Sequence, residues 1–174
     1  ILKGMYKIKQ ISKNKKTKIQ LLGSGTILRE MMQAADILDK DFKIDCDVWS
    51  VTSFNELRKD GMEVENENIK NASNKPKESF VATSFSEHDI PTVASTDYMR
   101  AYSEQIRPYI NSSYYTLGTD GFGRSDSRAK LREFFEVDAK SIVMTAAYAL
   151  YKEDQLNKKE LQKIYKEIKV DKSK

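Results

Sequence analysis

The sequence is poor in the residues that form cross-links and common metal sites, with one cysteine and one histidine among 174 residues. A single cysteine cannot form an internal disulfide, so packing must hold the fold, as in proteins of a reducing compartment. A closed zinc site needs about four Cys or His ligands, which excludes that type of centre. Any metal would have to be held by oxygen ligands.

The chain also lacks a segment for membrane insertion or secretion. No apolar run approaches the roughly 20 residues that a membrane-spanning helix needs. The sequence starts at Ile1, with neither an initiator Met nor the apolar region of a signal peptide. We therefore expect a cytoplasmic chain without membrane contact, which begins inside a longer protein.

The composition is that of one globular domain over residues 1–174, with 39% hydrophobic and 32% charged residues. The net charge of +4 is unevenly distributed, because residues 1–18 contain seven lysines and no acid. Residues 152–174 contain eight lysines and five acids, so the body between the two ends is acidic overall. Nucleic-acid binding requires basic and aromatic side chains mixed along one surface. We therefore expect no nucleic-acid partner and interpret the lysine-rich ends as solvated surface.

The first half of the chain predicts strands that alternate with helices. Apolar and polar residues alternate over 5–22 around a turn at 12–15, which predicts a hairpin or two strands at a sheet edge. Residues 19–22 then lead through Gly23-Ser24-Gly25 into helical spacing from Ile27 onward. A second strand is predicted at 47–52, with a helix after it. Two such strand–helix units indicate a parallel sheet.

The second half continues this pattern after a polar, Asn-rich stretch at 60–80, which we interpret as a surface loop or frayed helix. Together the segments predict a mostly parallel sheet of about five strands with helices on both faces. The apolar pattern resumes at 80–82 and 92–95, a further strand is predicted at 114–117, and helices are predicted at 99–106, 127–135 with Asp126 as N-cap, 138–152 and 158–168.

Three short features suggest chemistry, and each has a simpler interpretation. The Gly23-Ser24-Gly25 turn before a helix could bind phosphate, but a dinucleotide fingerprint needs glycine where Leu28 stands, so a tight turn is favoured. His88 lies between two acids and could serve in acid–base catalysis, although an exposed loop histidine is the simpler interpretation. Cys46 precedes a buried strand and is interpreted as a small buried hydrophobe rather than a nucleophile.

The densest polar cluster is the loop at 118–127, with glycines at 118, 121 and 123 around Phe122. Its residue types fit an anion site, an interface or a calcium-type loop, although the order of acids in an EF-hand is absent. A thiamine diphosphate anchor would need a glycine at Thr119 and paired asparagines near Ala149, and it is absent too. We expect the loop to be buried or to face an interface, fixed by charge-assisted hydrogen bonds. The residues expected to make them are Asp120, Arg124, Asp126 and Arg128.

Several stretches, in order and spacing over nearly the whole chain, resemble the C-terminal domain of the homodimeric pyruvate dehydrogenase components, which belong to the transketolase superfamily. The loop at 117–127 is the most specific of them, and shorter versions of it occur in other transketolase-like enzymes. The stretches are 19–25 (IQLLGSG), 50–57 (SVTSFNEL) with Asp60-Gly61, 93–99 (VASTDYM), 117–127 (LGTDGFGRSDS), Leu131-Arg132 and 135–138 (FEVD).

The resemblance implies an α/β/α sandwich that serves as a structural and dimerisation domain. In that family the preceding domains bind thiamine diphosphate and Mg²⁺, and the acetyl group formed from pyruvate passes to a lipoyl group of an acetyltransferase partner. No catalytic, cofactor-binding or metal-binding residue is therefore assigned to this chain, and the chain alone is expected to be inactive. The alternatives are a docking module for the acetyltransferase through the basic N-terminal hairpin, the equivalent domain of another transketolase-like enzyme, or a small-ligand enzyme that uses the Gly23 turn.

Overall fold

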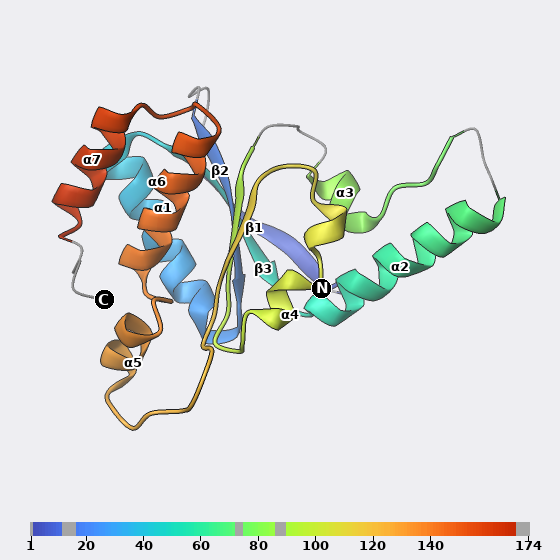
Figure 1. Ribbon diagram of the computed structural model, residues 1–174, viewed down its shortest axis with the longest axis horizontal. Coiled ribbons are helices and arrows are strands. Elements are labelled where there is room, and N and C mark those ends of the chain that lie inside the picture. The colour runs from blue at the N-terminus through green and yellow to red at the C-terminus, as the bar shows by residue number, and fades with distance from the viewer. Residues whose placement is uncertain (1, 12–16, 72–74, 86–89, 170–174) are drawn as a thin grey trace.

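The computed structural model describes residues 2–11, 17–71, 75–85 and 90–169. A five-stranded sheet stands at the centre, and helices cover both of its faces (Figure 1). The predicted three-layer α/β/α sandwich is therefore confirmed. His88 falls outside the described residues, so its place in the fold stays a prediction.

The sheet has the strand order β1-β3-β2-β4-β5. The central strand β2 pairs in parallel with β3 on one side and with β4 on the other, and β4 pairs in parallel with β5. Only β1 runs antiparallel, paired with β3 at one edge. The sheet is therefore mostly parallel, as predicted. The strands are β1 (Met5–Ile11), β2 (Lys18–Ser24), β3 (Asp45–Val51), β4 (Thr92–Ser95) and β5 (Tyr114–Leu117).

The predicted N-terminal hairpin is wrong, although both of its strands form. β1 pairs with β3, and β3 separates it from β2. The physical reason lies in β2, where every side chain from Ile19 to Leu22 is buried. A strand that is buried on both faces belongs in the middle of a parallel sheet, where helices cover it from both sides. The edge position is therefore correct for β1 alone.

One face of the sheet is covered by α1 (Leu28–Phe42) and α6 (Ala139–Lys152), with α7 (Lys158–Glu167) outside them (Figure 1). Small and aliphatic side chains from α1 and α6 form one buried cluster with the sheet. Cys46 belongs to this cluster, and its Sγ donates to the carbonyl of Ile44 at 3.7 Å. Its interpretation as a small buried side chain is confirmed.

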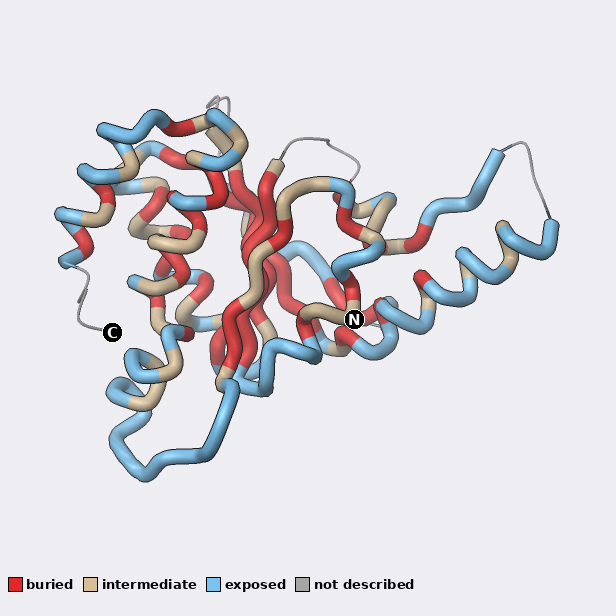
Figure 2. Tube along the Cα trace, in the orientation of Figure 1, coloured by how far each residue is buried: buried red, intermediate tan, exposed pale blue. Residues whose placement is uncertain are grey.

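The opposite face is covered by α2 (Phe54–Asn71), α3 (Phe80–Ser84) and α4 (Ala101–Glu104). α2 packs near its start and then projects away from the body as an exposed rod (Figures 1 and 2). The Asn-rich stretch predicted as a loop or frayed helix over 60–80 is thus helical as far as Asn71, whereas 75–79 have no helix or strand, so each alternative holds for part of it. The apolar segment at 80–82 lies in α3.

Two predicted helix boundaries differ from the structure. The helix expected at 99–106 is reduced to α4, followed by a 3₁₀ turn at Arg107–Tyr109, because Pro108 has no N–H to donate and disfavours α conformation before it. α5 (Arg128–Phe134) is capped by Ser127, whose hydroxyl accepts from the Lys130 N–H, and not by Asp126. The helices at 138–152 and 158–168 form as expected, with N-caps Asp138 and Asn157.

Candidate functional site

The candidate site lies where the chain leaves the carboxyl ends of β2, β4 and β5. From β2 the chain passes through α1 to β3 on one side, whereas from β4 it passes to β5 on the other side. The two connections diverge between β2 and β4 and leave a crevice at that point. In open α/β sheets, ligands bind in such crevices.

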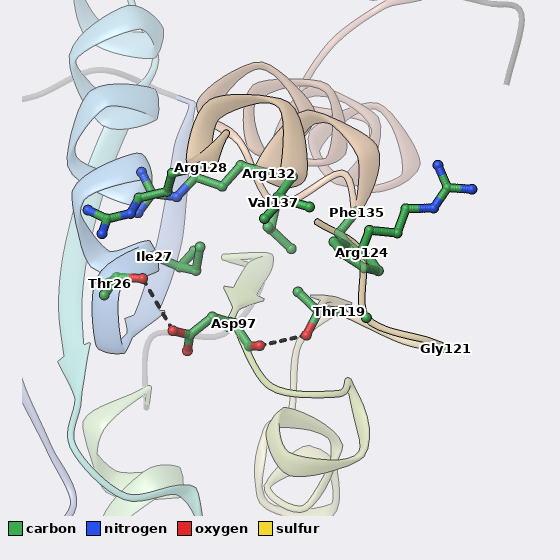
Figure 3. A pocket seen from close by; sticks show the side chains of 12 residues that line it. Thr26, Ile27, Asp97, Thr119, Gly121, Arg124, Arg128, Arg132, Phe135 and Val137 are labelled. Atoms are coloured by element: carbon green, nitrogen blue, oxygen red, sulfur yellow. Dashed lines mark hydrogen bonds between the residues drawn. The ribbon is translucent and has the colours of Figure 1, made fainter. Parts of the chain in front are cut away.

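A pocket of about 390 Å³ occupies this crevice (Figure 3). One wall comes from the turn after β2, a second from the loops after β4 and β5, and the third from α5 and the segment that follows it. The pocket is lined by Thr26, Ile27, Asp97, Thr119, Gly121, Gly123, Arg124, Arg128, Leu131, Arg132, Phe135 and Val137.

Asp97 holds the polar wall of this pocket together. Its Oδ2 accepts a hydrogen bond from the Thr26 hydroxyl at 3.2 Å, and its carbonyl accepts one from the Thr119 hydroxyl at 2.5 Å. Gly25 has a φ of +56°, and a β-carbon there would lie 3.1 Å from the Asp97 carboxylate. The Gly23-Ser24-Gly25 segment is therefore a tight turn against an acid, which disfavours a phosphate at that point.

Arg132 has a structural role in the pocket wall. Its Nη1 lies 2.6 Å from Oε1 of Glu30 on α1, and both side chains are largely buried. The second oxygen of Glu30 accepts the N–H of Ala139, the first residue of α6, at 3.0 Å. A charge-assisted pair of this kind is stronger than a neutral hydrogen bond. Glu30 thus fixes α5 and α6 against α1.

The polar residues of the loop at 118–127 behave differently from one another. Asp120 forms the charge-assisted contacts predicted for it, with Arg100 as the partner. Within the described residues, Asp126 accepts only the N–H of its neighbour Ser127, at 2.6 Å. Arg124 lies over the Phe134 ring at 3.8 Å from the centroid.

In the described part of the chain, neither Arg124 nor Arg128 forms an ion pair. The prediction that these two arginines fix the loop by charge-assisted hydrogen bonds is therefore wrong. The loop instead owes its position to Asp120 and to the backbone contact from the Thr119 N–H to the Tyr98 carbonyl, at 2.9 Å.

The loop is exposed rather than buried (Figure 2). Every residue from 120 to 130 is exposed, and Phe122 is 97% exposed. Tyr98 and Met99, in the segment joined to the loop, are 62% and 53% exposed. Burial of the loop within this domain is thus contradicted, whereas an interface role stays a prediction.

A second polar cluster lies at β5, the strand at one edge of the described sheet. Arg107 donates from Nε and Nη2 to the two oxygens of Glu104 at 2.6 and 2.8 Å, and from Nη1 to the Tyr114 carbonyl at 2.8 Å. The Arg107 guanidinium lowers the pKa of Glu104, and the carboxylate raises the pKa of Arg107. Burial raises the pKa of the Tyr114 hydroxyl, which donates to the Ser103 carbonyl. These groups anchor the sheet edge.

The sequence pattern did not single out Asp97, Thr26 or Glu104. Asp97 and Thr26 each follow the carboxyl end of a parallel strand, which is the signal that could have found them. Glu104 and Arg107 are three residues apart, but the 3₁₀ turn that brings them together was not expected.

Neither a cluster of metal ligands nor a membrane-spanning helix is found among the residues that the structure describes. Over these ranges, no three His, Cys, Asp or Glu side chains gather as metal ligands would. The helices of the same ranges include none with the length and apolar character to cross a membrane.

The fold is that of a transketolase C-terminal domain. Residues 4–138 match the model of the transketolase-like TK C-terminal domain, and the chain belongs to that family. A transketolase from Leishmania mexicana superposes with a TM-score of 0.55 at 17% identity, over 86% of this chain and 18% of that one. A transketolase from Pichia stipitis superposes with a TM-score of 0.57 at 16% identity, over 88% of this chain and 19% of that one.

Nearer in sequence are pyruvate dehydrogenase E1 components. That of Pseudomonas aeruginosa is 54% identical over 86% of this chain and 17% of the relative. The Escherichia coli K12 protein is 48% identical over 91% of this chain and 18% of the relative. The Cupriavidus necator protein is 44% identical over 100% of this chain and 20% of the relative. The chain thus spans about a fifth of the length of these relatives. The resemblance noted in the sequence is confirmed.

Proposed function

We propose that this chain is the C-terminal domain of a pyruvate dehydrogenase that decarboxylates pyruvate and passes the acetyl group to a lipoyl acetyltransferase. This proposal rests on the difference in sequence identity between two groups of relatives. Pyruvate dehydrogenase E1 components share 41–54% with this chain, whereas transketolases of the same fold share 12–18%.

In this proposal the chain itself does structural work, as one domain over residues 1–174 of a cytoplasmic enzyme. Thiamine diphosphate and Mg²⁺ belong to other domains, so the chain alone is inactive and contributes no catalytic residue. The absence of a thiamine diphosphate anchor from the sequence supports this division of roles. The partners are the rest of the same polypeptide, a second subunit and, for the whole enzyme, the lipoyl acetyltransferase.

The loop at 118–127 is the proposed contact with the rest of that enzyme. Phe122 in this loop is 97% exposed, and Tyr98 and Met99 in the segment joined to the loop are 62% and 53% exposed. Exposed large apolar side chains of this kind are often covered in interfaces. Docking of the acetyltransferase through β1 receives less support, because Lys7 and Lys9 are already paired with Asp47 and Asp36 at 2.8 and 2.5 Å.

Sedimentation and thermal melting of the full-length enzyme test the structural role. We expect Arg124→Ala and Phe122→Ser to weaken the dimer or lower the melting temperature, while thiamine diphosphate binds each remaining dimer as before. Lys163→Ala, which removes an exposed charge on α7, is the matched control and should change neither property. If both loop variants behave like this control, the structural role is wrong. A pull-down of the chain with the acetyltransferase tests the docking alternative.

A further inference from the structure

We propose that α2 packs beside α2 of a second copy of this chain, as a short parallel pair of helices. The contact is made by one exposed face of the helix, called here the seam. The inference adds a contact to the dimer proposed above, and it rests on that proposal only for the presence of a second subunit. The residues of the seam are Asn55, Lys59, Met62, Asn66 and Ile69.

The first argument is that α2 leaves the body of the domain. Its buried residues, Phe54, Leu57 and Gly61, all lie in the first half of the helix. The second half projects away from the body and is mostly exposed (Figures 1 and 2). This half contains three asparagines, which are weak helix formers, and so short a helix is marginally stable alone. A contact outside the domain would therefore stabilise it.

The second argument is that other sides of α2 are already occupied. The side-chain amide of Asn68 donates to the carbonyl of Lys77 and accepts its N–H, both at 2.9 Å. Asp60 accepts the N–H of Phe80 at 2.6 Å. Both α2 residues lie about 120–160° around the helix from Met62, at 3.6 residues per turn. The returning segment 75–80 thus leaves the seam open, and all five seam residues are exposed.

The third argument is the spacing of the seam. Its residues recur at intervals of four and three, which places Lys59 and Asn66 at positions a of a heptad and Met62 and Ile69 at positions d. Met62 and Ile69 are 39% and 72% exposed, so a second helix would bury apolar surface here. Polar residues at positions a fix the register of a helix pair at a cost in stability. A weak contact of this kind suits two subunits that are also joined elsewhere.

The fourth argument is charge complementarity. In a parallel pair, position g of one helix faces position e of the next heptad in the other helix. Arg58 would face Glu63 and Glu65 would face Lys70, and two-fold symmetry forms each of these pairs twice. Within the described part of the chain, none of these four charges forms an ion pair. They are therefore available to a second copy.

An antiparallel pair fits the charges less well. Positions e then face one another, which brings Glu63 against Glu56 or against Glu63 of the other copy, and like charges destabilise such a pair. The parallel pair has one repulsion, between the two Lys59 side chains. Within each chain this charge is partly neutralised by Glu56, whose Oε1 lies 2.7 Å from Nζ of Lys59.

Disulfide formation in the full-length enzyme tests the contact. Identical d positions lie side by side in a parallel pair, so Met62→Cys and Ile69→Cys should each join two subunits on mild oxidation, at a rate independent of enzyme concentration. Asn71→Cys is the matched control and should not join them, because this exposed residue lies on the side of the helix away from the seam. Cys46 is fully buried and should not take part.

Exchange of charges tests the direction of the pair. In the Ile69→Cys enzyme, Glu65→Lys should slow cross-linking roughly tenfold, since two exposed pairs change from attraction to repulsion. Adding Lys70→Glu should restore the rate. Residues 65 and 70 do not face each other on one helix, so the restored rate would report a contact between helices.

The proposal is overturned if the enzyme sediments as a dimer while Ile69→Cys cross-links no faster than Asn71→Cys, a result that leaves the structural role proposed above intact. Cross-linking by Met62→Cys without Ile69→Cys would contradict the parallel direction. The proposal also fails if Lys70→Glu does not restore the rate. An enzyme that sediments as a monomer would overturn both this contact and the proposed dimer.

Discussion

Asp120 contacts Arg100 twice, accepting its backbone N–H at 2.9 Å and lying 3.3 Å from its Nε. The two residues come from different connections, one after β5 and the other after β4. The contact therefore fixes the start of the exposed loop to the segment that carries Tyr98 and Met99. Removing it should free the loop without unfolding the sheet.

Asp120→Ala should speed hydrogen exchange at the Arg100 amide and lower the free energy of unfolding by about 1 kcal/mol, since the ion pair is exposed and the amide can bond to water. Hydrogen exchange read by NMR measures the first effect. Asp126→Ala is the control, because among the described residues its carboxylate bonds only the next one, Ser127. Unchanged exchange at Arg100 would show that the contact does not hold the loop.

Gly61 and Tyr109 make a second testable contact. A β-carbon at position 61 would overlap the Tyr109 ring, so Gly61 is what lets the 3₁₀ turn pack on α2. Gly61→Ala should destabilise the domain by about 1–3 kcal/mol, as overpacking does, although alanine is the better helix former.

Urea unfolding of the single and double variants checks this contact. In a Tyr109→Ala background the clash is gone, so the same Gly61→Ala change should instead stabilise the domain by up to about 1 kcal/mol. If Gly61→Ala changed the free energy of unfolding in the same direction in both backgrounds, the Tyr109 ring would not be the cause of the destabilisation.

Acid should weaken the anchor of β5. Arg107 and Thr116 donate to Glu104 and hold its pKa below the ordinary value of 4.5, so the folded state binds fewer protons than the unfolded state as pH falls. The stability from Glu104 is present above about pH 4.5 and is lost below it. Because the Glu104 side chain is 36% exposed, we expect less than about 1 kcal/mol. Unfolding curves of Glu104→Gln should therefore depend less on pH in this range, and an identical dependence would contradict the assignment.

The Cys46 thiol should react only when the domain unfolds. Its side chain is fully buried in the cluster shared by α1, α6 and the sheet. Labelling with a thiol reagent should therefore be slow in buffer and should follow the urea unfolding transition. Complete labelling of the native chain before any unfolding would show that this cluster opens locally.

The strands of the sheet could be predicted because their side chains are apolar in short runs, and the helices α1, α6 and α7 because apolar residues recur at helical spacing. The hairpin prediction failed because alternation predicts a strand without naming its partner. β1 finds its partner in β3, which lies about 40 residues further along the chain. Pairing across such a separation is decided by packing of the whole sheet.

The site was harder to predict than the fold. Asp97 and Thr26 meet although 71 residues separate them, and only the strand order brings them together. Arg132 was read as part of a family resemblance, but its pairing with Glu30 depends on the angle between α5 and α1. The loop at 118–127 was recognised from its glycines and charges, whereas its exposure depends on which surfaces the rest of the domain covers.

The arrangement β1-β3-β2 has a consequence for synthesis of the chain. These three neighbouring strands and α1 are complete once residue 51 has left the ribosome, so three of the five strands can assemble early. The helix α6 that covers the same face is made only at residues 139–152. A nascent chain halted between these points presents a bare apolar layer, and chaperones that bind such layers should recognise this stage of translation and release the chain when α6 arrives.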